Sequence, residues 1–408
     1  MRDFPTIYDL VLYTILVAPG VMRKALLLLA GTKSVYAAVQ KGVSQGHIRE
    51  SRIKLSSYAR AKTITSYVIT PAGMAYLQAR ASQYPEEARW VAALPETENV
   101  YFRPGAANNS TMLRVARSAS SVVIAALCNA HVAPALLPST AYKSQERARD
   151  GNYSELICSA LGSHMPRNIN PCVSSEVWYF TADQAKALLS EQKPREAGAD
   201  RTRYVGVFAT PKSLFFVFYL LNGGLPINKL FTLQEHSDYC ACFKHPAFHQ
   251  KGDPVDYQCA PAMRGIVIID SPRVFAQMYQ SALETNYQSR EAKMVECMDV
   301  FDFSPGGIAT LRLLLTGVLE SRIDAMINSA AKLANFTKNN NLNEARYYPL
   351  VHEDGAPVLN GMVLSALRLT KHKGVRPVPK HILCFKWQVQ YYKKIFPYAE
   401  FLFANDPK

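Results

Sequence analysis

The sequence predicts a mixed α/β (α+β) protein, in which a small helix-rich N-terminal unit precedes a larger domain of mixed sheet and helices. Three observations predict this class. The 408 residues are 49% hydrophobic and 19% charged, which suits two or three packed domains and excludes a disordered chain. Stretches with helical periodicity alternate with strand-like stretches, without internal repeats. The 46 lysines and arginines outnumber the 32 acidic residues, and this excess is gathered in two segments.

Positive charge is concentrated near both ends of the chain. Between Val21 and Arg80 there are ten basic residues and one acidic residue, Glu50. The segment Arg368–Lys394 contains eight basic residues and no acidic one. The whole chain carries a net charge of +14. A localised basic surface is what binding to an anionic partner such as nucleic acid requires.

Local signals in the first 80 residues predict six elements in order. The apolar run Pro5–Val17 predicts one helix, and Val21–Ala30, which follows a Pro-Gly turn, predicts a second. A third helix comes next. The β-compatible stretches Ile48–Leu55 and Thr63–Thr70 flank a polar tip and predict a hairpin. Thr70-Pro71 then predicts a fourth helix, with threonine as its cap and proline at its first position.

The third helix is predicted to start at Thr32 or Ser34, either of which would cap it, and to end near Gln45 because a glycine follows. Valines recur at every fourth position and predict its buried face: Val35, Val39 and Val43. The other face then carries polar and basic residues, namely Lys33, Tyr36, Ala37, Gln40, Lys41 and Ser44.

This order of elements resembles the winged-helix family of DNA-binding domains over residues 15–80. The likeness lies in the Gly31-Thr32 turn, in the exit Gln45-Gly46-His47-Ile48, and in Ile69–Leu77, where a hydrophobic-Thr-Pro-x-Gly pattern enters a helix. The resemblance implies that the third helix enters the major groove and that the hairpin, called the wing, contacts phosphates. The implied DNA-binding residues are Lys33, Tyr36, Gln40, Lys41, Ser44, Arg49, Arg52, Lys54, Arg60 and Lys62.

The predicted domains are a DNA-binding domain at 1–80, a linker at 81–110 and a mixed α/β domain at 111–408, for which a division near residue 300 is left open. In the larger domain we predict helices at 111–131, 182–192, 273–284 and 308–334. We predict strands at 176–181, 204–210, 214–221 and 265–270, of which 204–210 and 214–221 form a hairpin with a central second strand.

A winged helix ahead of such a domain also resembles the replication-relaxation proteins of plasmids and conjugative elements, through the helix Arg114–His131 and the segment Arg201–Val207. That resemblance implies a role in replication, mobilisation or regulation of a mobile element. Double-stranded DNA is then the main partner, and other proteins of a mobile-element complex and a second copy of the chain are further options. A third interpretation is a winged helix that docks proteins instead of DNA.

An alternative of another class is a metal-dependent nuclease or DNA-nicking enzyme. Asp270 with Glu291-Ala292-Lys293 is similar to the acid and Glu-x-Lys arrangement of such nucleases, but a predicted helix separates the two parts, so surface charge is the preferred interpretation. Tyr391-Tyr392 would supply a nucleophile, but no base or metal-binding triplet accompanies it, so aromatic packing is preferred. Nucleotide-binding and serine-hydrolase motifs are absent from the sequence, and we expect no catalysis and no cofactor.

One short segment combines thiols and imidazoles: Cys240, Cys242, His245 and His249. Four such ligands would close a tetrahedral zinc site, but a Cys-x-Cys pair is tighter than usual for zinc. We therefore prefer a polar loop without bound metal.

The sequence predicts a cytoplasmic chain. Its apolar runs near the N-terminus are too short to span a membrane, no signal peptide is predicted, and eight scattered cysteines suit a reducing compartment. Near the other end, Ile382–Val389 alternates as a half-buried strand would, with aromatic side chains inside. A second, weaker nucleic-acid surface is then expected at Lys371, Lys373, Arg376 and Lys380.

Overall fold

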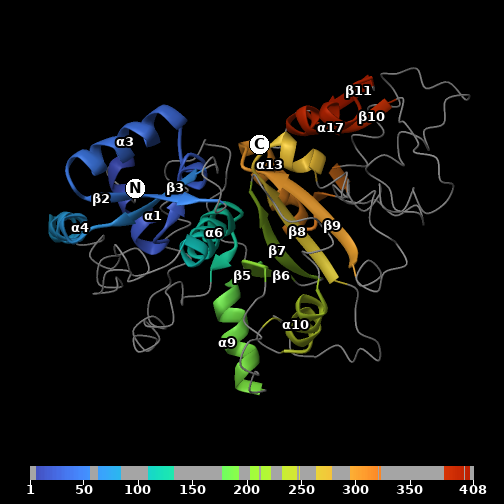
Figure 1. Ribbon diagram of the computed structural model, residues 1–408, viewed down its shortest axis with the longest axis horizontal. Helices are drawn as coiled ribbons and strands as arrows, with labels where there is room; N and C mark the ends of the chain where they lie inside the picture. Colours follow the sequence, from blue (N-terminus) through green and yellow to red (C-terminus); the bar gives the residue numbers. More distant parts are fainter. Residues whose placement is uncertain are drawn as a thin grey trace, which may run out of the picture. The chain divides into compact units, whose positions relative to one another are not determined.

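The computed structural model (Figure 1) contains helices and strands in both of its units, which confirms the mixed α/β class. It describes residues 6–55, 63–83, 109–132, 177–192, 203–210, 213–221, 232–245, 248, 263–277, 295–319, 321–322, 381–398 and 400–404. The chain forms two units, residues 1–188 with 205–207, and residues 189–204 with 208–408. The predicted linker at 81–110 stays a prediction, since residues 84–108 lie outside the described ranges. The division near residue 300 also stays a prediction.

The first unit begins with α1 (Ile7–Val17), which confirms the helix predicted at Pro5–Val17. The hydroxyl of Thr6 caps this helix by accepting a hydrogen bond from the Asp9 N–H at 3.1 Å. Nearly all described side chains of α1 are buried, and those of Leu10, Val11 and Ile15 are fully buried. A helix that is buried on nearly every side belongs in a core, and α1 packs against α3 (Thr32–Ser44), β3 (Thr63–Ile69) and α4 (Pro71–Gln83).

The predicted second helix is wrong in part. Val21–Met22 forms a strand, β1, and only Arg23–Leu26 is helical, as α2. Gly20, with a φ of +90°, turns the chain so that β1 pairs antiparallel with Tyr67 and Ser66. The backbone of Val21 and Met22 therefore pairs with β3 and is not part of the helix that the local sequence had predicted.

The third helix, α3 (Thr32–Ser44), ends where predicted because Gly46 adopts a φ of +72°. The predicted cap is wrong: Gly31 is the N-cap and makes no side-chain hydrogen bond, so Thr32 is already helical. The predicted buried face is confirmed at Val35 and Val39 but is wrong at Val43, which is 37% exposed.

Two small residues, Ala38 and Gly42, complete the buried face of α3. A Cβ at Gly42 would come within 2.3 Å of Ile48, so the small residue lets the following strand pack closely against the helix. The spacing of the valines predicted which side of α3 is buried. Close packing against Ile48 determines that Gly42 lies on that side.

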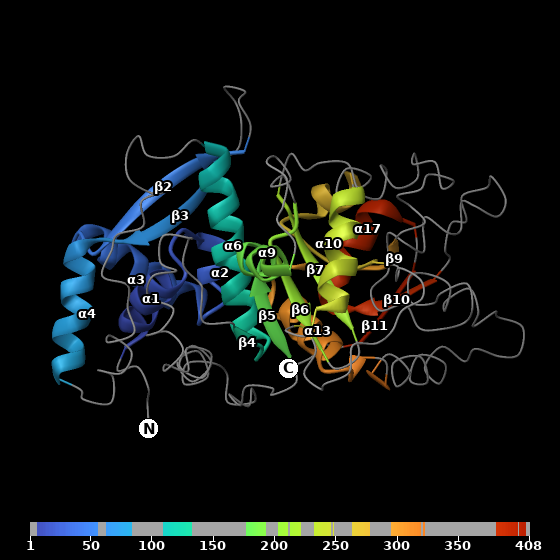
Figure 2. The same ribbon diagram turned by 90° about the horizontal axis from the view of Figure 1, so that it is seen from below.

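The predicted hairpin is present as β2 (Ile48–Lys54) and β3 (Thr63–Ile69), which pair antiparallel in a three-stranded sheet of order β1-β3-β2. The helix α4 (Pro71–Gln83) follows, as predicted, with the Gly73 N–H donating to the Thr70 hydroxyl at 3.1 Å. Figure 2 shows β2 and β3 as two long strands side by side, of which β3 leads into α4.

The first unit continues with α6 (Asn109–Leu127), β4 (His131–Val132), β5 (Trp178–Thr181) and the start of α9 (Ala182–Gln192). The helices and β5 lie close to their predicted positions. The helix α6 packs against β1, where the Met22 N–H donates to the Ser120 hydroxyl at 3.0 Å. The two strands pair in parallel.

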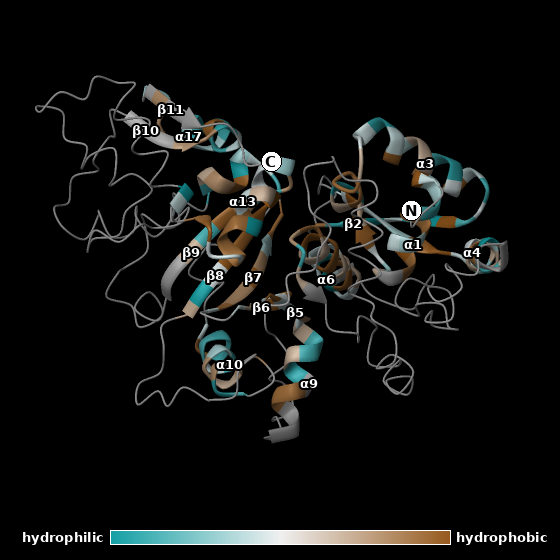
Figure 3. Cartoon of the chain, turned by 180° about the vertical axis from the view of Figure 1, so that it is seen from behind, coloured by the Kyte–Doolittle hydropathy of each residue, from teal (hydrophilic) through white to brown (hydrophobic). Residues whose placement is uncertain are grey.

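The second unit contains the parallel strands β7 (Leu214–Leu220), β8 (Met263–Ile269) and β9 (Val295–Asp302). All of β7 is buried, as predicted for a central strand, and Figure 3 shows its hydrophobic colouring. The strand β6 (Gly206–Ala209) precedes it, and the Thr210 N–H donates to the Ser213 carbonyl in the connecting turn at 2.9 Å. The sequence did not predict β9, because acidic residues interrupt its apolar pattern.

Helices α10 (Leu233–Lys244) and α13 (Pro305–Leu315) accompany these strands. The segment 308–334, predicted to be mostly helical, is helical over α13 and again at 319 and 321–322, but Gly317 with a φ of +72° interrupts it. Residues 323–334 lie outside the described residues. The last described elements are β10 (His381–Phe385), a short 3-10 helix η5 (Lys386–Gln388), α17 (Val389–Ile395) and β11 (Glu400–Ala404), with β10 and β11 parallel. No helix in the described ranges is long and apolar enough to cross a membrane.

Candidate nucleic-acid interface

The exposed face of α3 is the first part of the candidate interface. The buried residues of α3 fix the helix against the unit and turn the opposite face to solvent. Figure 3 shows hydrophilic residues along this helix. The structure brings five of the predicted DNA-binding residues together on this face, all exposed: Lys33, Tyr36, Gln40, Lys41 and Ser44. Tyr36 is 49% exposed, which is unusual for so large an aromatic side chain.

The strand β2 contributes a second group of predicted residues, but not all on one face. Arg52 and Lys54 follow Glu50 at every second position, so all three lie on the same face of the strand, and Arg52 and Lys54 are exposed. Arg49 falls on the other face and is half-buried. The sequence pattern grouped Arg49 with the interface, and strand alternation separates it.

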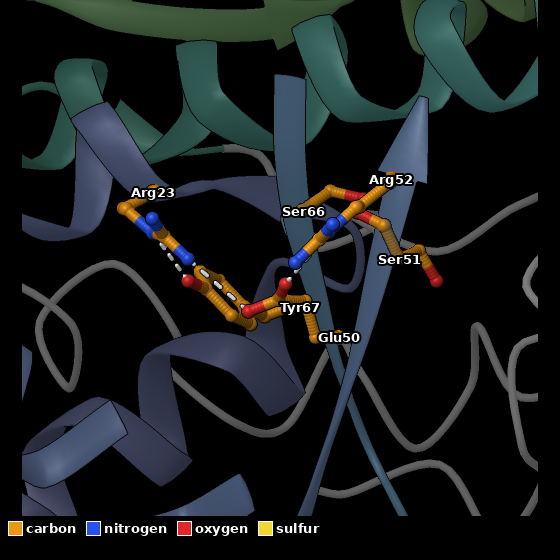
Figure 4. A network of polar contacts seen from close by, with 6 residues as sticks. All are labelled: Arg23, Glu50, Ser51, Arg52, Ser66 and Tyr67. Atoms are coloured by element: carbon orange, nitrogen blue, oxygen red, sulfur yellow. Dashed lines mark hydrogen bonds and ion pairs between the residues drawn. The ribbon is translucent and has the colours of Figure 1, made fainter. Parts of the chain in front are cut away.

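Glu50, the one acidic residue in the basic segment, lies at the centre of a polar network (Figure 4). The guanidinium of Arg23 donates from Nη2 to the Glu50 carboxylate at 3.1 Å and from Nε to the Tyr67 hydroxyl at 2.6 Å. Arg52 donates from Nε to the other Glu50 oxygen at 3.4 Å. Glu50 and Tyr67 are direct neighbours across β2 and β3, which explains why Arg23 reaches both.

Arg23 connects this network to α3. Its Cζ lies 6.0 Å from the ring centre of Tyr36 and 5.8 Å from that of Tyr67. Burial lowers the pKa of Arg23, but the hydrogen bond to Tyr67 and the charge of Glu50 outweigh it and raise that pKa above its ordinary value. The residue was not among those predicted from the sequence, because it was assigned to the middle of a helix and its partners are distant in the chain.

The C-terminal end of α3 is held by a separate cluster. The Lys41 ammonium lies 4.6 Å from the ring centre of Tyr8, so one predicted DNA-binding residue also contacts α1. The Tyr8 hydroxyl hydrogen-bonds to Nδ1 of His47 at 2.7 Å and lies 3.0 Å from the side-chain oxygen of Gln45. Burial, and then the charge of Asp9, raise the pKa of Tyr8. These contacts fix the turn from α3 into β2.

Six of the predicted nucleic-acid-binding residues lie outside the described residues. Two belong to the tip of the wing, and four to the expected second basic surface. They are Arg60, Lys62, Lys371, Lys373, Arg376 and Lys380.

The segment with the thiols and imidazoles was predicted to be a polar loop, and this prediction is wrong. Cys240 and Cys242 lie on α10. The Cys242 side chain is fully buried, whereas Cys240 is partly exposed with Sγ 3.8 Å from both ring nitrogens of His236. Burial raises the pKa of the Cys240 thiol. His245 follows the helix and is buried, and His249 lies outside the described residues. In the described ranges no three metal-binding side chains converge on one position.

The C-terminal tyrosines are packed inside the second unit, which confirms the aromatic-packing interpretation. Tyr391 and Tyr392 are 3% and 2% exposed. The Tyr391 hydroxyl donates to the Asp302 carboxylate at 2.6 Å, and Trp387 Nε1 donates to the Thr310 hydroxyl at 2.9 Å. Burial first, and then the charge of Asp302, raise the pKa of Tyr391, which opposes formation of a nucleophilic phenolate.

The half-buried strand predicted at Ile382–Val389 is wrong in length and pattern. β10 ends at Phe385, and Cys384 and Gln388 are buried although the alternation placed them outside. The prediction that the aromatic side chains lie inside is confirmed at Phe385 and Trp387. Of the residues in the nuclease interpretation, Asp270 directly follows β8, while Glu291 and Lys293 lie outside the described residues.

No protein-family model, no curated protein and no solved structure matches this chain.

Proposed function

We propose that the chain binds double-stranded DNA through a winged helix in its first unit, with α3 as recognition helix and the β2–β3 hairpin as wing. The order of helix, short strand, two helices and two strands, with the sheet order β1-β3-β2, supports this proposal. In such a domain the helix before the hairpin lies in the major groove and the hairpin lies beside it.

The observation that carries the proposal is the composition of the exposed face of α3. It offers the ammonium groups of Lys33 and Lys41 and the amide of Gln40, and α3 contains no acidic residue. Lysine and glutamine side chains suit the acceptors and donors of base edges and the charge of phosphates. Arg52 and Lys54 extend the positive surface along β2.

We further propose, from the resemblance to replication-relaxation proteins, that this binding serves replication, mobilisation or regulation of a mobile element. The second unit then contributes assembly or partner contacts. A gene neighbourhood with relaxase or coupling-protein genes would support this role, and a neighbourhood of unrelated metabolic genes in several genomes would contradict it.

DNA binding is tested by titrating the full chain against a fluorescent duplex in low salt and repeating the titration with Lys33, Gln40 and Lys41 replaced by alanine. We expect salt-dependent binding that the triple variant weakens by at least ten-fold, because it removes two phosphate-binding charges and a base contact. Replacement of Arg114, an exposed arginine of α6 ion-paired to Asp183 at 3.1 Å, is the control and should leave binding unchanged. Absence of binding would favour the protein-docking alternative.

A further inference from the structure

The guanidinium of Arg23 has unused hydrogen-bonding capacity. A guanidinium carries five N–H groups in one plane. Among the described residues, two of them are used, one by the Tyr67 hydroxyl and one by the Glu50 carboxylate. The side chain is 37% exposed, so three N–H groups remain available at a surface that solvent reaches.

The position of this guanidinium is fixed on several sides. Tyr67 is fully buried in the middle of the three-stranded sheet, and its hydroxyl accepts from Nε of Arg23. Glu50 accepts from Nη2, and the rings of Tyr36 and Tyr67 both face Cζ. An arginine held in this way loses little further conformational entropy when it binds a ligand.

Arg23 also lies between the two parts of the candidate interface. Tyr36 belongs to the exposed face of α3, and Glu50 and Arg52 belong to the exposed edge of β2. Arg23 contacts Tyr36 and Glu50, and Glu50 contacts Arg52, so these residues form one continuous chain of contacts. Figure 4 shows the part of this chain that joins Arg23, Glu50 and Arg52. A phosphate bridging α3 and β2 would approach this guanidinium.

We propose that Arg23 binds one DNA phosphate, and that Tyr67 and Glu50 act as positioning residues that hold its guanidinium ready. The remaining N–H groups of Arg23 bind two oxygens of the phosphate, the geometry that guanidinium groups favour. The Glu50 carboxylate thus neutralises part of the local positive charge, and its hydrogen bond orients the guanidinium of Arg23. The inference deepens the proposed DNA binding and rests on it.

The test is the salt dependence of duplex binding by the full chain with Arg23→Ala. Each phosphate contact adds about 0.9 to the slope of log affinity against log salt, so between 50 and 200 mM salt one contact accounts for about a 3.5-fold change in affinity. The wild-type chain should therefore lose about 3.5-fold more affinity over this interval than the variant. Arg114→Ala, which also removes an ion-paired arginine, should keep the wild-type slope.

Two further variants separate positioning from folding. Arg23→Lys keeps the charge but has three N–H groups and no planar fork, so it cannot bind two phosphate oxygens while it is bound to Tyr67 and Glu50. The slope should stay wild-type while affinity falls several-fold. Tyr67→Phe keeps Arg23 and removes its Nε acceptor, and it should behave in the same way. If Arg23→Ala unfolds, these two variants still test the inference, since wild-type affinity in both would overturn it.

The outcomes also separate this inference from the proposed function. A wild-type chain that does not bind duplex DNA refutes both. A chain that binds with a salt slope unaffected by Arg23→Ala keeps the proposed function and overturns the role of Arg23.

Discussion

Gly73 is the position where a single methyl group should disturb the junction between α3, the wing and α4. The carbonyl of His47 accepts a hydrogen bond from the Thr70 N–H at 3.0 Å, and the Thr70 hydroxyl donates to the Gly46 carbonyl at 2.6 Å. A Cβ on Gly73 would lie 2.3 Å from that His47 oxygen and 2.7 Å from a carbon of Ile69. The glycine of the Thr-Pro-x-Gly pattern is therefore required by close packing of α4 on the α3–β2 turn.

The effect of Gly73→Ala is the difference between two opposing terms. Alanine favours a helix over glycine by about 1 kcal/mol. Relieving the clash requires a shift of about 1 Å in packed backbone, and overpacking of this kind costs about 1–3 kcal/mol. Weakening the hydrogen bond from Thr70 to His47 costs about 1 kcal/mol more. We expect a net loss of about 1–3 kcal/mol in the local stability of this junction.

Hydrogen exchange read by mass spectrometry measures this loss, because amide protection reports local opening without unfolding of the whole chain. Protection in residues 63–83 should fall by about 5- to 140-fold, at 1.4 kcal/mol for each factor of ten. Gly31→Ala is the matched control, because no atom lies within 4 Å of the added Cβ, and it should leave these residues protected as in the wild type. Unchanged or increased protection in Gly73→Ala would refute the packing argument.

Three other predictions concern the rest of the chain. Burial and the charge of Asp9 raise the pKa of Tyr76 to about 12, above its unfolded value of about 10. The stabilisation that Tyr76 contributes should therefore be present below pH 10 and lost between pH 10 and 12. Tyr76→Phe should make the unfolding temperature fall less steeply over this interval, and an identical fall in the variant and the wild type would contradict this. Tyr391→Phe removes a buried hydrogen bond to Asp302 and should destabilise the second unit by about 1.5–3 kcal/mol without changing any action on supercoiled DNA, whereas loss of nicking at normal stability would revive the enzyme alternative. Charge reversal in the second basic segment should weaken binding of long duplexes more than of short ones, and equal effects would exclude a second surface; the residues to change are Lys371, Lys373, Arg376 and Lys380.

Short-range signals made much of the first unit predictable. The end of α3 follows from Gly46, and the start of α4 follows from Thr70-Pro71, because caps and turns depend on residues a few positions apart. The exposed face of α3 could be predicted because five of its residues share one side of a helix. The prediction was wrong at Val43, which is 37% exposed, whereas its neighbour Gly42 is buried against Ile48.

Features that depend on distant partners could not be predicted. Two residues of strand, Val21–Met22, exist because β3 lies beside them, and no local pattern distinguishes them from a helix start. The network of Arg23 joins residues 27 and 44 positions apart in the chain. In the second unit, β9 contains Asp299, which is fully buried. An acidic residue normally indicates an exposed position, so the sequence pattern did not predict this core strand.

Photochemical cross-linking tests most directly whether α3 lies on DNA bases. The full chain is bound to a duplex in which thymines are replaced by bromodeoxyuridine, irradiated and digested, and the cross-linked peptides are identified. Because Tyr36 is exposed in the middle of the basic face of α3, we expect cross-links in the peptide that contains it, and competing unlabelled duplex should remove them. Cross-links confined to other segments, or none under conditions in which the duplex is bound, would contradict the assignment of α3 as the recognition helix.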